Sequence, residues 1–457
     1  LFNSTFTIIT APQKQIIGDL LQGRVDSKLL VVQLLPLDRS RVEKLASLSL
    51  SDVTEFITAV DKAFAWEFAR RPLDVISLIQ YWRVTHKIGT LREVIDWDIK
   101  TKLKPREDRD EHPLSSLDAY RGSTQLAAAC TFTRTFTLTV PDDGVDDANG
   151  LSPRDCLPET WDDVSIRALH NRPIFDAATY GRFRFHHRMI VEYLSSQWIS
   201  QCMKDGCPLD ALEDLLSAPY QGKRILRQYL KPITAWLCIG NESWNEMVRD
   251  LVLRSEPSIL LSYGDPANLT VEYRVTVLKK LAAVSRNRKR MRLDSSQDTL
   301  ARISTPELSA TISEMILDTQ LPSDLRIEYV DIARHGRLKG CLEACIHVLR
   351  SDEPRDTVKY YATDAIIEMG EPDGIVELLS SLGAMESIPE EVSALAIGHL
   401  YPGTMTSNQL IEFASKTRPR LSYETFSIDV KRLRMRLTPG DASAILNTLQ
   451  TLATPMI

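Results

Sequence analysis

Several signatures of catalytic proteins are missing from this sequence of 457 residues. It contains no GxxxxGK[ST] stretch, the loop whose backbone amides surround nucleotide phosphates, and the nearest approach, Gly222-Lys223-Arg224, lacks the upstream glycine and the hydroxyl residue. It also contains no GxSxG turn for a serine nucleophile and no recognisable cysteine and histidine spacing of a thiol hydrolase. We therefore expect no catalytic activity from this chain alone.

Paired cysteines, long apolar runs and a signal peptide are missing as well. The seven cysteines are odd in number and form no CxxC pair, which argues against a disulfide framework and a zinc site and favours a reducing compartment. No apolar run approaches the roughly 18 residues that span a bilayer, and the N-terminus lacks the basic and then apolar order of a signal peptide. We expect a cytoplasmic protein without a membrane segment.

Excess positive charge is absent, since the net charge is −6, and this argues against a surface that binds polyanions over its whole area. The basic run at 286–292 has no interleaved aromatic residues for base stacking, so we expect a solvated loop there rather than nucleic-acid contact. The acidic segment at 142–147 lacks the ligand order of a calcium loop and is expected to be solvated too. We predict no metal site.

The first part of the chain combines strand-like and helical patterns. The runs at 5–10 and 28–34 are short, apolar and β-branched, like buried strands at the end of an α/β sheet. Asp38, Pro72 and Thr90 then each mark the start of a predicted helix, and another helix is predicted to begin at Ser51 with Asp52 in its first turn. The predicted buried face of the third helix carries Leu73, Ile76, Ile79 and Trp82. Because the chain begins on Leu1 inside a strand-like run, we expect it to be part of a longer protein.

A hairpin and a following helix are predicted in the middle of the chain. TFTRTFTLTV at 131–140 alternates strictly with a period of two, which indicates a strand. The stretch from Ile174 to Phe185 is predicted to form a hairpin with Phe183 and Phe185 toward the core, and an amphipathic helix follows it. Two helices, a hairpin and a helix in this order resemble a winged-helix domain.

From about residue 200 the pattern predicts helices without strands and an internal repeat. Gly336 and Gly370 are 34 residues apart, as are Gly340 and Gly374, and the stretches around them match as DIARHGRLKGCLEACIHVL and AIIEMGEPDGIVELLSSL. A weaker third copy places 400–403 at the corresponding turn. Helical pairs with this period are typical of an α-solenoid close to HEAT repeats, which usually binds proteins.

Two adjacent histidines lie in RFRFHHRMIVEYL at 182–194. Neighbouring helical residues point about 100° apart, so His186 and His187 do not form a chelating pair. A side chain where a strand meets a helix N-terminus lies beside free backbone amides, a setting that suits a phosphate. The residues leave two readings of His187 open, a phosphate contact or a core residue that packs or caps, and they place His186 toward solvent.

FRFHHRMIVEYLSSQWI resembles the F-x-H-R-x-x-x-E-Y-L-A-A segment in the winged-helix domain of STAND-class NTPases, the NACHT and NB-ARC relatives that include antiphage defence sensors. The resemblance implies that His187, five residues before Glu192, contacts the β-phosphate of ADP, with His186 as the other candidate. FARRPLDV at 68–75 is similar to the family's [G/R]-x-P-L-x-[LV] motif, which implies that Pro72 packs by the adenine and that Arg71 borders the pocket.

The sequence departs from the family at two places. Residues 10–13 read TAPQ where many relatives carry an arginine that senses the γ-phosphate, and neither the P-loop nor the Walker B acid is present. The resemblance therefore implies that ADP or ATP with Mg²⁺ would bind mainly through residues encoded upstream, and that the full-length protein is an ATPase.

The predicted fold is mainly α: the end of an α/β NTPase sheet, a helical bundle, a winged helix and a HEAT-like solenoid. The predicted parts are 1–35, 36–110, 111–200, 201–300 and 301–457. The predicted function is a nucleotide-switched signalling or defence protein that senses a protein ligand, for example a viral one, on its repeats and forms a homo-oligomer when activated. The alternative is a constitutive solenoid scaffold whose winged helix is purely structural, and a DNA-binding regulator is a third reading.

Overall fold

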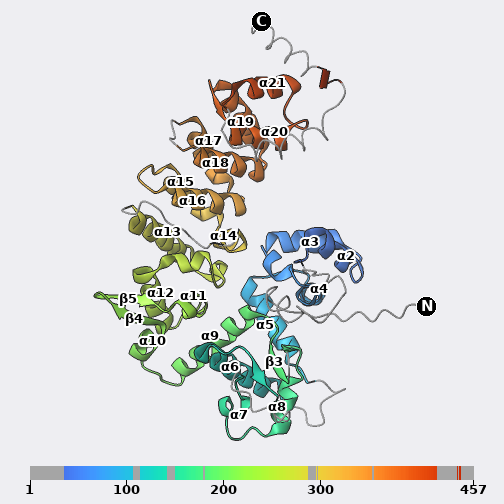
Figure 1. The fold of residues 1–457 in the computed structure, drawn as a ribbon, viewed down its shortest axis with the longest axis vertical. Coiled ribbons are helices and arrows are strands. Elements are labelled where there is room, and N and C mark those ends of the chain that lie inside the picture. The colour runs from blue at the N-terminus through green and yellow to red at the C-terminus, as the bar shows by residue number, and fades with distance from the viewer. Residues whose placement is uncertain are drawn as a thin grey trace, which may run out of the picture.

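The computed structural model describes residues 35–105, 114–140, 150–178, 181–286, 297–351 and 355–418, with a few single positions besides. The predicted strands at 5–10 and 28–34, the acidic segment at 142–147 and all of the basic run except Arg286 lie outside these residues. Within them the protein is mainly helical, as predicted. Figure 1 shows helices α2 to α5 beside a column of helices that runs from α9 to α21.

Four helices follow the predicted start signals. They are α2 (Arg39–Ser47), α3 (Val53–Lys62), α4 (Pro72–Thr85) and α5 (Leu91–Lys102), with the 3-10 turn η1 (Trp66–Ala69) before α4. The side chains of Asp38 and Asp52 accept hydrogen bonds from amides of the first turns of α2 and α3. Thr90 and Glu93 form a reciprocal capping box on α5. Helix α3 begins at Val53, two residues after the predicted start at Ser51, while the caps of α2 and α5 are those predicted, because capping is decided within four residues.

The buried face of α4 differs from the prediction. Ile79 and Trp82 are buried as expected, but Leu73 and Ile76 are each 42% exposed, and Val75 and Leu78 fill the core in their place. The prediction was wrong because the apolar residues of this helix surround most of its axis, so the sequence allowed more than one face to turn inward.

The next segment contains a small sheet between helices. Its elements are α6 (Ser116–Thr133), β1 (Leu138–Thr139), α7 (Pro153–Cys156), α8 (Asp163–His170), β2 (Phe175–Ala177), β3 (Arg182–Phe185) and α9 (Arg188–Lys204). The strand order is β1-β3-β2 with antiparallel neighbours, and Phe175 pairs with Phe185. This confirms the predicted hairpin, and Phe183 and Phe185 are buried as expected.

The predicted strand at 131–140 is wrong over most of its length. α6 continues through Thr133, and only Leu138 and Thr139 form a strand. The reason is tertiary packing against α9: the hydroxyls of Thr131 and Ser195 lie 3.0 Å apart, and the rings of Phe132 and Trp198 meet edge to face. Packing of this kind outweighs the strand preference of an alternating threonine stretch.

Beyond α9 the chain contains strands that the sequence did not reveal. The elements are α10 (Leu209–Leu216), β4 (Ser217–Tyr220), β5 (Lys223–Leu226), η2 (Gln228–Leu230), α11 (Lys231–Leu237), α12 (Ser243–Ser255), η3 (Pro257–Leu261), η4 (Pro266–Asn268) and α13 (Val271–Ser285). Strands β4 and β5 form an antiparallel hairpin around Gln221 and Gly222, which both have positive φ. The prediction of helices alone was therefore wrong, and the two-residue turn was the missed signal.

The remaining elements are stacked helix pairs. They are α14 (Gln297–Ile303), η5 (Pro306–Leu308), α15 (Ser309–Leu317), α16 (Ser323–His335), η6 (Lys339–Cys341), α17 (Leu342–Arg350), α18 (Asp356–Met369), α19 (Pro372–Ala384), β6 (Ile388–Pro389), α20 (Glu390–Leu400), α21 (Ser407–Lys416) and β7 (Thr417–Arg418). Helices α14, α16, α18 and α20 pack in one layer, and α15, α17, α19 and α21 in a second (Figure 1). Strands β6 and β7 pair in parallel.

The repeated glycines occupy equivalent places in these pairs. Gly336 and Gly370 cap the ends of α16 and α18. A Cβ on Gly340 would lie 2.7 Å from Ser309 Cβ of the preceding pair, and one on Gly374 would lie 2.8 Å from Leu342 Cδ1 of its own preceding pair. The sequence repeat therefore marks positions where consecutive helix pairs approach closely.

The buried apolar side chains of the described residues form three hydrophobic cores. One joins the helices from α2 to α9, a second lies among α9 to α13, and the third runs from η3 through α21. The first core contains residues from both sides of the predicted boundary at 110, for example Ile99 and Leu126. The predicted domain boundaries stay predictions. No helix among the described residues is both long and apolar enough to cross a membrane.

Candidate functional site

The structure brings the two predicted site segments together. Arg71, just before α4, donates a hydrogen bond from Nη1 to the carbonyl oxygen of His186 at 2.9 Å, across 115 positions of sequence. The ring of Phe68 lies against that of His187, with 6.2 Å between centroids. Arg71, Pro72 and His187 therefore belong to one place on the molecule, where α4 meets the junction of β3 and α9.

His187 is the N-cap of α9. Its backbone is extended, and its Nδ1 accepts a hydrogen bond from the amide of Met189 at 3.0 Å. Nδ1 is therefore unprotonated, and the neutral ring carries its hydrogen on Nε2. Burial and, after it, the positive charge of Arg71 together lower the pKa of His187 to about 4. At neutral pH the half-buried side chain thus offers an uncharged N–H donor.

His186 is buried, which corrects the expectation that it faces solvent. Its Nε2 lies 2.7 Å from the ammonium of Lys102, and its Nδ1 lies 2.9 Å from the carbonyl oxygen of Ile174 in front of β2. Because an ammonium only donates, Nε2 accepts and Nδ1–H donates. Burial lowers the pKa of His186, and the neighbouring Lys102 acts in the same direction. His186 is therefore a neutral anchor inside the protein.

Lys102 is held in a buried cluster of charges. Its ammonium donates to Asp98 Oδ2 at 2.9 Å, and Asp74 Oδ1 lies 3.9 Å from the Nε2 of His186. One carboxylate oxygen of each aspartate has no hydrogen-bond partner. Burial raises the pKa of Asp74 to about 6, and the nearby Asp98 raises it too, while Lys102 opposes this. Two carboxylates thus share one ammonium away from water.

The outer side of this cluster combines a cation with apolar surface. Arg71 and Pro72 are exposed, and the 42% exposure of Leu73 and of Ile76 places apolar area beside the guanidinium. Arg71, His187 and the N-terminus of α9 all provide hydrogen-bond donors, which suits an anionic group with an apolar portion. None of these residues is placed as a nucleophile or general base.

The sequence interpretation missed Asp74, Asp98 and Lys102. Asp98 and Lys102 are four residues apart on α5 and share the face of Leu91 and Ile95, which are buried. A charged pair at buried positions of an amphipathic helix was the available signal. No group of three or more His, Cys, Asp or Glu side chains in the described ranges, this cluster included, is arranged to hold a metal ion.

Comparisons with known proteins do not identify a relative. No family model matches the chain, and no curated protein matches it. The interpretation of the site therefore rests on the two motifs and on the contacts between them.

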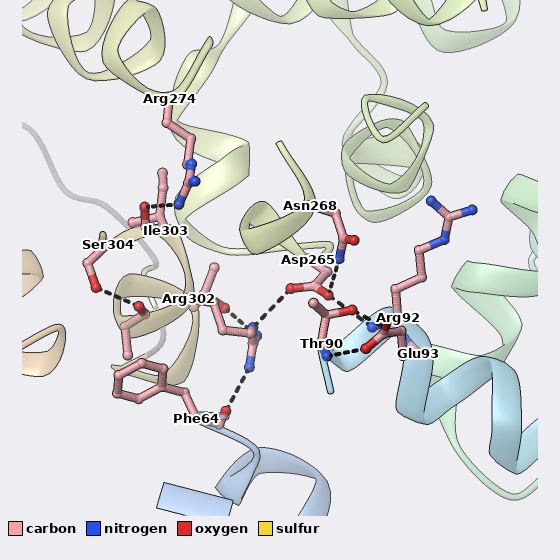
Figure 2. Close-up of polar contacts among 12 residues, drawn as sticks. Phe64, Thr90, Arg92, Glu93, Asp265, Asn268, Arg274, Arg302, Ile303 and Ser304 are labelled. Carbon is pink, nitrogen blue, oxygen red and sulfur yellow. Dashed lines mark hydrogen bonds and ion pairs between the residues drawn. The ribbon is translucent and has the colours of Figure 1, made fainter. Parts of the chain in front are cut away.

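A further contact connects this site with the later helices. The carboxylate of Asp265, before η4, lies at the N-terminus of α5 beside Arg92, and Arg302 of α14 lies between Asp265 and the carbonyl of Phe64 (Figure 2). The opposite end of α5 carries Lys102, the partner of His186. The 12-residue helix α5 thus contacts Asp265, which lies against Arg302 of α14, at one end and the histidine pair at the other.

Proposed function

We propose that this chain is part of a STAND-class signalling NTPase of the cytoplasm, in which a winged helix, formed by β1 to β3 with α6, α8 and α9, holds ADP through His187. The observation that supports the proposal is the hydrogen bond from Arg71 to the carbonyl of His186, because it brings together two motifs whose residues are 115 positions apart and which a nucleotide site would have to share.

The donors at this place fit the phosphates of ADP. His187 is neutral and presents Nε2–H, Arg71 adds a guanidinium, and Pro72 with Leu73 offers apolar surface for the base. The proposed switch has two states, one with ADP bound and one with ATP and Mg²⁺ bound, and the two ligands differ in the phosphate charge that they bring to this site. The proposal requires a P-loop and a Walker B acid that this sequence does not contain, so hydrolysis is not proposed for these residues by themselves.

The stacked pairs from α14 to α21 are proposed as HEAT-like repeats that bind a protein ligand, for instance a viral protein. Ligand binding would shift the population from a closed, ADP-bound state to an open one that takes ATP and forms a homo-oligomer. Helix α5 provides a physical route, since Asp265 contacts its first turn and His186 contacts its last. A differential affinity of a few kcal/mol shifts such an equilibrium strongly.

The first test separates the donor of His187 from its capping role. Asparagine is a good N-cap residue, so His187→Asn keeps the α9 cap but removes Nε2–H, whereas His187→Ala removes both. In the full-length protein we expect His187→Asn to lose the bound ADP, quantified by chromatography after heat release, and to signal without ligand. His335→Asn, on the repeats, serves as the matched control and should retain ADP.

The alternative is a constitutive scaffold, and one observation favours it. The bond between His187 Nδ1 and the Met189 amide accounts for His187 as a cap without any nucleotide. In that case His187→Asn behaves like the unaltered protein, and His187→Ala loses only the roughly 1 kcal/mol of a helix cap. Absence of a P-loop in the sequence encoded before Leu1 would also decide for the scaffold.

A DNA-binding regulator predicts a steep dependence of duplex affinity on salt. Of the basic run, the described Arg286 is engaged with Asp318 at 2.8 Å. A flat binding isotherm at low salt would remove this reading.

A further inference from the structure

The C-terminal end of α9 is a Schellman turn. After the helix ends at Lys204, Gly206 adopts a φ of 98°, and its amide donates to the carbonyl of Met203 at 3.2 Å. The amide of Cys207 donates to the carbonyl of Cys202 at 3.1 Å. These are the two nested hydrogen bonds that define the motif, with glycine at its left-handed position.

This turn brings two cysteines together. In a Schellman turn the side chains of the third helical residue from the end and of the second residue beyond the cap frequently meet, and here these positions are Cys202 and Cys207. The two thiols are close enough that the neighbouring Cys207 helps to raise the pKa of Cys202, after burial. Cys207 is exposed and Cys202 is half-buried, whereas four of the other cysteines are buried: Cys130, Cys238, Cys341 and Cys345.

We propose that Cys202 and Cys207 form a dithiol site that reacts with oxidised low-molecular-weight thiols, of which glutathione disulfide is the example, and becomes an intrachain disulfide. A disulfide needs Cα atoms about 4.4–6.8 Å apart and Cβ atoms that face each other. The backbone hydrogen bond from the amide of Cys207 to the carbonyl of Cys202 holds the two residues side by side across the turn, as this bridge requires.

The exchange runs in two balanced steps. The Cys207 thiol loses its proton and attacks one sulfur of glutathione disulfide, the S–S bond breaks, and the first glutathione leaves as a thiolate that takes up a proton. The Cys202 thiol then loses its proton and attacks the Cys207 sulfur, which displaces the second glutathione in the same way. Two protein thiols are oxidised to one disulfide, and glutathione disulfide is reduced to two glutathione molecules.

The order of attack follows from exposure. Cys207 meets solvent first, while burial and the neighbouring Cys207 raise the pKa of Cys202, which suits Cys202 to the second, intramolecular step. The disulfide would tie the end of α9 to the turn that leads into α10. This inference is independent of the nucleotide switch.

Mass spectrometry of the chain after incubation with glutathione disulfide and acid quenching tests the proposal. The unaltered chain should lose two hydrogens, with both cysteines in one disulfide-linked peptide and no lasting glutathione on Cys207. Cys202→Ser should carry a stable glutathione on Cys207, because the resolving thiol is gone. In Cys207→Ser, Cys202 should carry neither a disulfide nor a glutathione. Cys156→Ser is the control and should react like the unaltered chain.

Two results would overturn the inference. One is a stable glutathione adduct on Cys207 of the unaltered chain at the level found in Cys202→Ser. The other is that both thiols of the unaltered chain can still be alkylated after the incubation, although Cys207 of the Cys202→Ser variant becomes glutathionylated under the same conditions. Circular dichroism of each variant verifies that the helices are intact, since both side chains are near the surface.

Discussion

Asp265 accepts a hydrogen bond from the backbone amide of Arg92, with 2.9 Å between Oδ2 and the nitrogen, although 173 positions separate the two residues. The first amides of a helix have no intrahelical acceptor, so this carboxylate completes the cap that Thr90 and Glu93 begin on α5. Its negative charge also interacts favourably with the helix N-terminus. Arg302 lies against the same carboxylate and donates to the carbonyl of Phe64 at 3.3 Å (Figure 2).

We expect Asp265→Ala to lower the free energy of unfolding by about 2–3 kcal/mol, because it removes the buried carboxylate that accepts from the Arg92 amide and lies beside the guanidinium of Arg302. Urea denaturation followed by tryptophan fluorescence measures this. Asp318→Ala removes the partner of the exposed Arg286 and should cost less than about 1 kcal/mol. Similar losses in the two variants would mean that Asp265 does not join the two parts of the molecule.

His187 should make the protein less stable in acid. Its pKa is lowered to about 4 in the folded protein from 6.5, so the unfolded chain binds the proton more readily as the pH falls below 6.5. The stability that the folded protein gains from neutral His187 is present above pH 6.5 and is lost as the pH falls toward 4. Relative to His187→Asn, the unaltered chain should lose about 2 kcal/mol between pH 7.5 and 4.5. A pH-independent difference between the two proteins would contradict this.

Asp74 should act in the opposite direction. Its pKa is raised to about 6 from 3.8, so its contribution favours the folded state at low pH and is lost as the pH rises through 6. We expect Asp74→Asn to raise the free energy of unfolding by about 2 kcal/mol at pH 7.5, since it removes an incompletely paired buried charge. The gain should largely disappear near pH 4. Asp210→Asn, at an exposed position, is the control and should change stability little at either pH.

Gly340 and Gly370 should respond differently to alanine. Gly370 has a φ of 67°, so Gly370→Ala should cost about 1 kcal/mol through backbone strain alone. At Gly340 the added Cβ would lie 2.7 Å from Ser309 Cβ and 2.9 Å from its Oγ. Adding Ser309→Gly should therefore restore stability to Gly340→Ala, as measured by thermal unfolding. If Ser309→Gly gave no recovery, the close approach of the helix pairs would not be the reason for this glycine.

Much of the fold was predictable wherever the cause is local. The starts of α2 and α5 follow from Asp38 and Thr90, and the hairpin of β2 and β3 follows from alternating phenylalanines. The candidate site was predictable in part. Arg71 and His187 could be named from motifs, but the burial of His186 depends on Lys102, which is 84 positions away.

The sequence by itself determined the helical class, the caps and the spacing of the glycines, because each depends on a few neighbouring residues. Only the tertiary structure decided that α6 continues through Thr133, that Leu73 is exposed, and that Asp265 holds α5. These features depend on partners distant in the chain: α9 packs against α6, the other helices choose which face of α4 is buried, and folding brings a carboxylate to amides that no local residue satisfies.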